Sequence, residues 1–552
     1  MPLTGGGCAG PGGGARAARV ALSPESRAPR NACIIIMTDA DRAAAPLICG
    51  AFDVAAGAGP RPAAQTSRPL AYSVGRRAAG NATVRRGCAA ARQWCPCARQ
   101  YGVCGPLSAR APASARPGAM TRHRGQLRAT HWIVWTLCVI LCHVCEGSTP
   151  PDSLRLIWLS NTSLTCNDGS PAGYYFRRGS NNDHWVVYLE GGGYCWDAAS
   201  CGARWRRRPA LMSSSRWPRA RRAPALLSAD PAANPLWHAS NHVLLPYCSS
   251  DMWAGTRNTR TSSTRFVFSG RLIVRSVLSE LLHHGLTGRM LLVGSSAGGA
   301  GVMLHADAAR RALRSRGVRV AAIADSGWFL DRPAKTRRAP AATVAKLGHT
   351  LWRGKPPTSC VREHSAEPWL CYFGYRLYSH IRTPLFVFQY LFDSAQLAAE
   401  GVRAPRTRSQ WDAVHQTGAA LRSSLSSVRA AFAPACLAHG ALARPEWQAI
   451  NVSGITLPRA LACWEQRLDS GKRRARGGCA PRRLVERCTW PQCNGSCPRL
   501  RDPRTGEEVA LASLLQSFGL DVRGAAAAMG LDARALSRMS RAELLPLLAP
   551  HM

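Results

Sequence analysis

One ten-residue stretch, residues 290–299, constrains the fold of this chain more than any other. It reads Met-Leu-Leu-Val-Gly-Ser-Ser-Ala-Gly-Gly, an apolar run that enters Gly-x-Ser-x-Gly and continues into a helical pattern over 300–316. Glycines on both sides of Ser296 allow a tight strand-to-helix turn, which lifts the serine hydroxyl above the edge of a sheet. The pattern predicts a nucleophile elbow with Ser296 as the nucleophile.

The order of elements around this motif indicates an α/β fold. Strand and helix patterns alternate, with strands expected at 185–189, 241–246, 318–324 and 385–390 and helices at 271–284 and 300–316. Such alternation is typical of a mainly parallel sheet with helices on both faces, whose ligand site lies at the carboxyl ends of the strands. We expect one α/β-hydrolase domain over 148–522 with disulfide-stapled insertions, followed by a tail at 523–552 that can be helical.

The first 147 residues differ in composition from the rest. Residues 1–119 are rich in Ala, Gly, Pro and Arg without a sustained apolar period, so we expect disorder or an extension of the gene model. Residues 120–147 combine a basic start, an apolar run at 132–141 and small residues near Gly147, the pattern of a secretory signal peptide. That run is too short to span a bilayer. The prediction is a secreted, extracellular protein without an integral membrane span, translated from Met120.

Cysteine usage agrees with export. The chain has 22 cysteines, and an even dozen of them follow residue 147. In an oxidising compartment this number predicts six disulfides, with Cys195–Cys201 and Cys360–Cys371 expected as local pairs.

Two other features bear on the secretory route. Asn161, Asn451 and Asn494 each begin a glycosylation tripeptide, which is used only in an exported chain. Cys488, Cys493 and Cys497 are spaced like part of a zinc knuckle, but no histidine stands at ligand spacing nearby. We therefore predict glycosylation and no metal site.

The chain is strongly basic, with a formal net charge of +41. Such a surface attracts sulfated glycans, acidic membranes or nucleic acid, and export disfavours nucleic acid as a partner. The positive charge is almost all Arg, which nucleotide-composition bias also produces, so a solvated face is the alternative to a sulfated polysaccharide site. Two clusters are candidates for the site: Arg204, Arg206, Arg207, Arg208, Arg216, Arg219, Arg221 and Arg222, and then Lys472, Arg473, Arg474 and Arg476.

A serine nucleophile needs a base and an acid that orients the base. Asp393 directly follows the strand pattern at 385–392, where the acid is expected, although it could instead cap a helix over 394–400. Asp325, at the end of another strand, is the rival acid. For the base, His439 lies in a loop beside a cysteine and His415 in a polar helical stretch. The residues themselves favour His439 without excluding His415.

The predicted strand at 185–189 runs into Glu190 and three glycines. Glycines let backbone amides point at a developing negative charge without an obstructing side chain, as in the oxyanion loops of esterases. Gly192 and Gly193 are the candidate donors on one side, and Ala297, just after the nucleophile, on the other. The alternative for the glycines is a plain hairpin or bulge.

These motifs lie in longer segments that together resemble the Notum family of secreted carboxylesterases, relatives of the plant pectin acetylesterases. The resemblance covers roughly 154–522 and rests on residues 161–175, 246–255, 294–299, 325–331 and 392–397. It implies that His439 is the base and that no cofactor is used. It also implies an acyl pocket formed by Tyr194, Phe329, Tyr372 and Phe373. The implied substrate is the palmitoleate ester on a serine of lipidated Wnt proteins, and the implied partner is the heparan sulfate of glypicans.

The chain departs from the family pattern in two places. Gly193 stands where the family typically has Trp, which removes a large apolar contact from the pocket mouth. The cysteine pair that the family carries after Trp-Phe-Leu-Asp is absent from 331–349. Two alternatives therefore stay open: an extracellular O-acetyl esterase acting on a polysaccharide, and a catalytically silent heparan sulfate-binding protein, which the complete triad disfavours.

Overall fold

A computed structural model describes residues 152–548 except for 261–263, 334–338, 403–404, 406, 470–478, 502–504, 511, 514–515, 517–520 and 529. The predicted extension at 1–119, the predicted signal peptide at 120–147 and the basic cluster at 472–476 lie outside the described residues. Within the described part, no helix is both long enough and apolar enough to cross a membrane.

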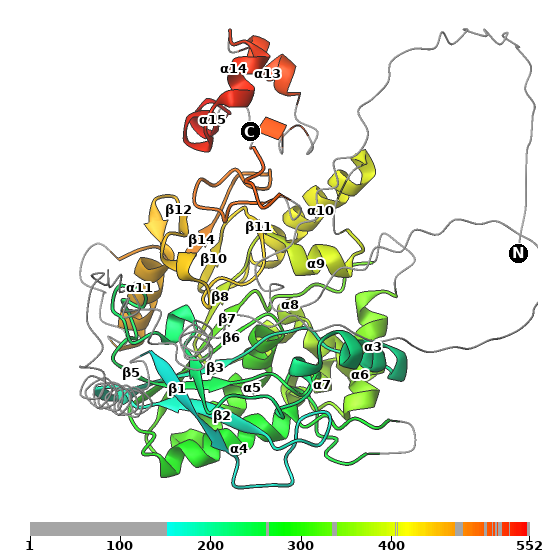
Figure 1. The fold of residues 1–552 in the computed structure, drawn as a ribbon, viewed down its shortest axis with the longest axis vertical. Coiled ribbons are helices and arrows are strands. Elements are labelled where there is room, and N and C mark those ends of the chain that lie inside the picture. Colours follow the sequence, from blue (N-terminus) through cyan, green and yellow to red (C-terminus); the bar gives the residue numbers. More distant parts are fainter. Residues whose placement is uncertain are drawn as a thin grey trace, which may run out of the picture.

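A ten-stranded sheet forms the centre of the molecule (Figure 1). Its spatial order is β14 (Arg483–Val485), β10 (Ala431–Ala433), β8 (Leu385–Phe388), β7 (Arg319–Asp325), β6 (Arg289–Ser295), β3 (Asn181–Leu189), β5 (Ser240–Leu245), β2 (Gly173–Arg177), β1 (Ser153–Trp158) and β4 (Ala220–Arg222). The strands from β14 through β5 are parallel, whereas β2, β1 and β4 add an antiparallel edge.

Both faces of this sheet are buried. Along β3, Trp185 and Val187 face one hydrophobic core, and Val186 and Tyr188 face the other, as the period of two in a strand requires. Helices α4 (Gly270–His283) and α5 (Ala297–Arg314) contribute to the first core, and α11 (Leu457–Asp469) contributes to the second. Burial on both faces explains why the parallel strands read as continuous apolar runs. The predicted α/β fold is confirmed.

The structure differs from the sequence prediction around the expected strand at 385–390. The sheet strand β8 ends at Phe388, and a separate short strand, β9 (Phe392–Asp393), pairs in parallel with β11 (Leu437–Ala438). In this register Phe392 lies opposite Leu437, and Asp393 lies opposite Ala438. Residue 439 directly follows Ala438, the residue that pairs with Asp393, so this small second sheet brings residue 439 close to Asp393.

Among the described residues of the tail there are three helices: α13 (Val522–Ala528), α14 (Ala533–Arg538) and α15 (Arg541–Leu548). They are drawn in orange and red at the top of Figure 1, beyond the end of the central sheet. The described part of the C-terminal tail is thus largely helical.

Five disulfides occur among the described residues: Cys166–Cys248, Cys195–Cys201, Cys360–Cys371, Cys436–Cys497 and Cys488–Cys493. The two local pairs expected from the sequence are confirmed. All three cysteines of the rejected zinc knuckle are used in disulfides, so their thiolates are not available as metal ligands.

Cys463 and Cys479 remain as thiols. The neighbouring Cys463 side chain raises the pKa of the Cys479 thiol, and the N–H of Ala480 donates to the Cys463 sulfur at 3.2 Å. Cys463 is buried in α11, and Cys479 is half-buried. The dozen cysteines of the domain are therefore arranged as five bonds and one adjacent pair.

We predict that the exported protein oxidises this adjacent pair into a sixth disulfide. Closing a loop of roughly 15 residues stabilises a fold by about 3 kcal/mol in the chain-entropy account, so the Cys463→Ser, Cys479→Ser variant should melt at a lower temperature. Thiol alkylation under denaturing, non-reducing conditions, followed by mass spectrometry, should leave both cysteines unlabelled. Stoichiometric labelling of both residues in the exported protein would contradict the prediction.

Candidate active site

The predicted elbow is present at the end of β6. Ser296 separates this strand from α5 and has φ +59° and ψ −122°, a strained conformation for a residue with a side chain. Close packing requires glycine two residues later, because a Cβ at Gly298 would lie 2.0 Å from the carbonyl oxygen of Leu189. The turn leaves Ser296 half-buried at the carboxyl edge of the sheet.

Asp393 makes the contacts expected for both alternatives that the sequence left open, the helix cap and the partner of a histidine. Its Oδ1 accepts hydrogen bonds from the N–H groups of Ala395 and Gln396, each at 2.9 Å, and so caps α9 (Ser394–Ala399). Its Oδ2 accepts from Nδ1 of His439 at 2.8 Å and from the Gln389 side chain at 3.0 Å. The carboxylate is fully buried. Four donors therefore hold it in one orientation toward the imidazole.

His439 has the geometry of a general base. Because the Asp393 carboxylate only accepts, Nδ1 carries the proton of the neutral ring and Nε2 presents a lone pair. Nε2 is inaccessible to solvent and has no hydrogen-bond partner among the described residues. Burial opposes protonation of His439, but the charge and hydrogen bond of Asp393 outweigh it, so the pKa of the imidazole is raised above its ordinary value. The Phe329 ring lies 6.2 Å away, centroid to centroid.

His415, the alternative base, lies elsewhere. It is on α10 (Arg408–Ser424), where its ring makes an edge contact with Trp490 at 4.7 Å and with Phe392 at 6.4 Å. Its Nδ1 lies 3.4 Å from the carbonyl oxygen of Thr489. The structure thus gives His415 a packing role and brings His439 to Asp393.

Asp325, the rival acid, instead joins the elbow to the histidine loop. Its buried carboxylate accepts hydrogen bonds from the Ser295 hydroxyl and from the N–H groups of Ala441 and Leu442, at 2.9 and 3.0 Å through Oδ2. Its carbonyl oxygen accepts from the N–H of Ser296 at 2.9 Å. Asp325 therefore fixes both the nucleophile turn and the segment that follows His439.

The sequence did not reveal this role. Ser295 stands at the variable position of Gly-x-Ser-x-Gly, where substitution is expected to be mild, yet the structure buries its hydroxyl against Asp325. The available signal was that Asp325 ends the strand after the elbow helix, because consecutive parallel strands often lie side by side. Here Ser295 and Asp325 are register partners.

The glycine loop after β3 lies directly against the nucleophile. A Cβ at Gly191 would be 2.7 Å from Cβ of Ser296, so only glycine permits this approach. Gly192 and Gly193 have φ values of +145° and +70°. In the part of the chain that the structure describes, the N–H groups of Gly192, Gly193 and Ala297 donate no hydrogen bond. Unpaired backbone donors beside a nucleophile are what an oxyanion hole requires.

The four residues of the expected acyl pocket fall into two groups. Tyr194 and Tyr372 both pack against a residue that sequence reasoning missed, Trp352, at 5.7 and 5.8 Å between ring centroids. Phe373 is buried next to Tyr372 in the chain, and Phe329 contacts His439. Burial raises the pKa of Tyr194 to about 12, so this ring stays neutral. Disulfides Cys195–Cys201 and Cys360–Cys371 fix the segments that carry the two tyrosines.

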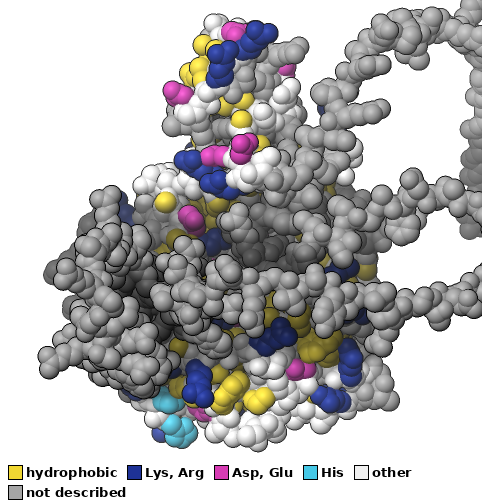
Figure 2. Space-filling view, in the orientation of Figure 1, with side chains coloured by type: hydrophobic (Ala, Val, Ile, Leu, Met, Phe, Trp, Pro, Cys, Tyr) yellow, Lys and Arg dark blue, Asp and Glu magenta, His cyan; other side chains and the backbone are white. Residues whose placement is uncertain are grey.

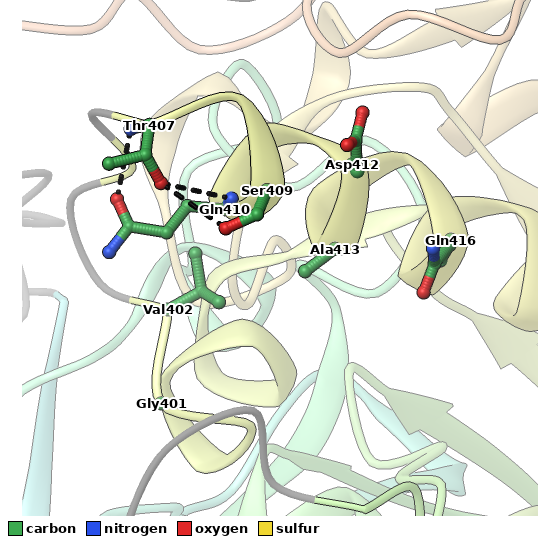
Figure 3. A pocket seen from close by; sticks show the side chains of 8 residues that line it. All are labelled: Gly401, Val402, Thr407, Ser409, Gln410, Asp412, Ala413 and Gln416. Atoms are coloured by element: carbon green, nitrogen blue, oxygen red, sulfur yellow. Dashed lines mark hydrogen bonds between the residues drawn. The ribbon is translucent and has the colours of Figure 1, made fainter. Parts of the chain in front are cut away.

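The hollow drawn in Figure 3 is not this site. It has a volume of about 400 Å³ and lies between the end of α9 and the start of α10. Thr407 and Gln410 point toward each other there because they form the capping box of α10. Its lining residues are Gly401, Val402, Thr407, Ser409, Gln410, Asp412, Ala413 and Gln416, which include no member of the triad. We assign no chemistry to it.

The three glycosylation candidates differ in exposure. Asn161 is exposed and Asn451 is half-buried. Asn494 is buried, and its amide nitrogen donates to the carbonyl oxygen of Asn451 at 2.6 Å and to Glu486 at 2.7 Å. Asn161 is thus the most accessible acceptor of the three.

The first basic cluster is divided by the fold. Arg204 and Arg221 contact other parts of the protein: Arg204 donates to the carbonyl oxygen of Gly192, and Arg221, whose side chain is 41% exposed, pairs with Glu190 at 2.5 Å. Arg206, Arg207 and Arg208 are exposed, as are Arg216, Arg219 and Arg222. On the face seen in Figure 2, the visible Lys and Arg side chains lie at several separate places. Among the described residues there is no cluster of His, Cys, Asp and Glu that could hold a metal ion.

Comparisons with known proteins show which proteins this chain is similar to. The Pectinacetylesterase family matches residues 151–498. Palmitoleoyl-protein carboxylesterase NOTUM of Drosophila melanogaster is 34% identical and covers 80% of this chain and 93% of that protein. The Mus musculus protein of the same name is 40% identical over 70% of this chain and 80% of its own length. The solved structure of the Wnt deacylase Notum from Drosophila aligns with a TM-score of 0.60 and 47% identity, over 63% of this chain and 99% of that chain.

We predict that His439→Ala abolishes ester hydrolysis and that His415→Ala does not, because only His439 is held by Asp393. Loss of the base in a triad hydrolase lowers kcat by a factor on the order of a million. Steady-state turnover of a soluble p-nitrophenyl ester measures both variants, with secretion yield as the control for folding. An inactive His415 variant beside an active His439 variant would reverse the assignment.

The raised pKa of His439 predicts an acid limit to activity. The imidazole accepts a proton only when neutral, so kcat/KM should fall as pH decreases through a pKa above the ordinary 6.5. Asp393→Asn removes the charge that raises this pKa, so the acid limb should move to lower pH while kcat drops by roughly 10⁴-fold. The pH profiles of kcat/KM test this, and an unmoved acid limb in the Asp393 variant would contradict it.

Proposed function

This chain belongs to the Notum family of carboxylesterases, and from that premise we propose a secreted serine carboxylesterase that removes the palmitoleate ester from a serine of Wnt proteins. Hydrolysis of this ester would inhibit Wnt signalling outside the cell. The observation that carries the proposal is the meeting of the Asp393–His439 pair, the strained Ser296 turn and unpaired backbone donors at one edge of the sheet. The names of the relatives supply the substrate.

The geometry supports a two-step acyl transfer. His439 Nε2 takes the proton of the Ser296 hydroxyl as its oxygen attacks the ester carbonyl, and Asp393 stabilises the resulting imidazolium. The negative oxygen of the tetrahedral intermediate accepts hydrogen bonds from Gly192, Gly193 and Ala297. Collapse of the intermediate leaves the acyl group on Ser296 and passes the proton from His439 to the departing serine of the substrate. Water, activated by His439, then hydrolyses the acyl-enzyme. No cofactor takes part.

The aromatic residues proposed for the acyl site favour a long acyl chain over acetate. Tyr194, Trp352 and Tyr372 form a continuous row of ring contacts, and burial of an acyl chain gains about 0.8 kcal/mol for each CH₂. The alternative, an O-acetyl esterase acting on a polysaccharide, is favoured by Gly193, which is exposed and lacks a side chain at the pocket mouth. A binding protein without catalysis would not require the hydrogen bonds that hold His439 and Asp393.

We predict that hydrolysis of a p-nitrophenyl octanoate exceeds hydrolysis of the acetate in kcat/KM. The enzyme should also release palmitoleate from a serine-acylated peptide, as measured by mass spectrometry. Ser296→Ala should abolish all three reactions and leave secretion intact, because it removes one half-buried hydroxyl. A clear preference for acetate would favour the polysaccharide esterase, and Ser296-independent turnover would reject the site.

The exposed arginines support heparan sulfate of glypicans as a partner. Arg206, Arg207 and Arg208 are exposed around the C-terminal end of α3 (Ala198–Arg207). Their charges would concentrate the enzyme where sulfated chains are attached to the cell surface, without contact to the reacting atoms. Export through the predicted signal peptide at 120–147 is part of this proposal, and disulfides are typical of the oxidising compartment that it requires.

We predict that replacing Arg206, Arg207 and Arg208 with Ser lowers the salt concentration at which the protein elutes from heparin. Exposed charge pairs are screened over about 8–10 Å at physiological ionic strength, so binding should weaken steeply with salt. Arg311, Arg314 and Arg316, which are also exposed, give a control variant with the same loss of charge. Turnover of a soluble ester should stay unchanged in both. Equal elution shifts in both variants would indicate a nonspecific effect of net charge.

A further inference from the structure

Arg204 is a largely buried cation beside the glycine loop. It projects from α3, and its Nη1 donates to the carbonyl oxygen of Gly192 at 2.7 Å, while Nε donates to the Ser250 hydroxyl at 2.7 Å. Its Nη2 is inaccessible to solvent and has no partner within the described residues. The guanidinium carbon lies 5.9 Å from the centroid of the Tyr247 ring.

Burying the Arg204 guanidinium is energetically unfavourable, which a purely structural role does not explain. Removing a guanidinium from water is unfavourable unless an opposite charge compensates. No carboxylate lies within ion-pair distance of Arg204 in the described part of the chain, unlike Arg221, which pairs with Glu190. Burial lowers the pKa of Arg204, because the charged guanidinium loses contact with water. Arg204 therefore binds the neutral carbonyl oxygen of Gly192 without the negative charge that compensates a buried arginine in an ion pair.

We propose that Arg204 is a positioning residue that aims the N–H of Gly193 into the oxyanion hole. In a trans peptide the carbonyl of one residue and the N–H of the next point in opposite directions. A cation that holds the Gly192 carbonyl therefore directs the Gly193 N–H away from α3. The inference rests on the proposed site, because it assumes that Gly193 donates to the oxyanion formed at Ser296.

The glycine loop requires such a constraint. Gly192 and Gly193 both have positive φ, and glycine populates several backbone conformations at similar cost, so their shared peptide is free to rotate unless it is held. A charge-assisted hydrogen bond is roughly twice as strong as a neutral one. It also polarises the peptide, which makes the Gly193 N–H a better hydrogen-bond donor.

The scaffold fixes Arg204 relative to the loop. Disulfide Cys195–Cys201 joins the loop to α3, and Asp197 and Ser200 form a capping box at the start of this helix. Ser250, the second partner of Arg204, accepts a hydrogen bond from the N–H of Cys195 at 3.1 Å. A Cβ at Gly193 would lie 3.7 Å from Nη1, so the guanidinium also occupies the space beside the residue that it positions.

The test compares Arg204→Lys and Arg204→Ala with the native enzyme on p-nitrophenyl octanoate. Loss of one oxyanion donor lowers kcat by about 10²–10³-fold, and we expect this loss in Arg204→Ala with KM changed by less than about threefold. An octyl trifluoromethyl ketone, which forms a tetrahedral adduct with the serine, should lose affinity in parallel with kcat/KM. Octanoate, which forms no such adduct, should inhibit as before. Guanidinium ion at millimolar concentration should restore part of the kcat of Arg204→Ala.

Two controls keep the proposal falsifiable. Arg314→Ala removes an exposed arginine near the end of α5 and should leave kcat and ketone affinity unchanged. If Arg204→Ala is not secreted, Arg204→Lys, which keeps a charge, gives the same comparison. Normal kcat, or a parallel loss of octanoate and ketone affinity, would overturn the inference alone. Turnover by Ser296→Ala would overturn the proposed site itself.

Discussion

The buried carboxylate of Asp325 is the constraint on which the rest of the site depends. It accepts hydrogen bonds from the elbow strand and from two amides after His439, and its own carbonyl receives the N–H of Ser296. A buried carboxylate requires several donors, and here the donors come from segments more than a hundred residues apart in the chain. Satisfying one carboxylate thereby aligns the nucleophile turn with the loop that carries the base.

The other members of the site are also held by hydrogen bonds that buried polar groups require. Asp393 caps α9 with one carboxylate oxygen and accepts a hydrogen bond from His439 with the other. The helix cap therefore also holds the carboxylate in its orientation toward the imidazole. The glycine loop approaches Ser296 so closely that no side chain fits between them. Arg204 then binds the carbonyl side of this loop and leaves the N–H side unpaired. The unpaired N–H groups and the strained backbone of Ser296 are energetically unfavourable, and they persist because the packing of the surrounding sheet holds them in place.

Sequence reasoning found the residues of the proposed active site more readily than those that support them. Ser296 and the glycine loop are local patterns, and Asp393 was a candidate because it ends an apolar run, with Asp325 as its rival. The choice of His439 needed the family resemblance, because the local sequence favours it without excluding His415. Trp352, Ser295 and Arg204 were missed or misread, since their roles are contacts with residues far away in the sequence.

The sequence by itself determined the α/β fold, the elbow and the two local disulfides, because each depends on residues within a few positions of one another. Only the tertiary structure decided that Asp325 links the elbow to the histidine loop and that Asp393 lies opposite Ala438 in a small separate sheet. It also separated Arg204 and Arg221, which bind other parts of the protein, from the remaining arginines of the cluster. These outcomes depend on contacts between residues far apart in the sequence. A buried polar group without a hydrogen-bond partner is unfavourable, so the fold brings a distant partner to it, and a local sequence pattern does not show which partner that is.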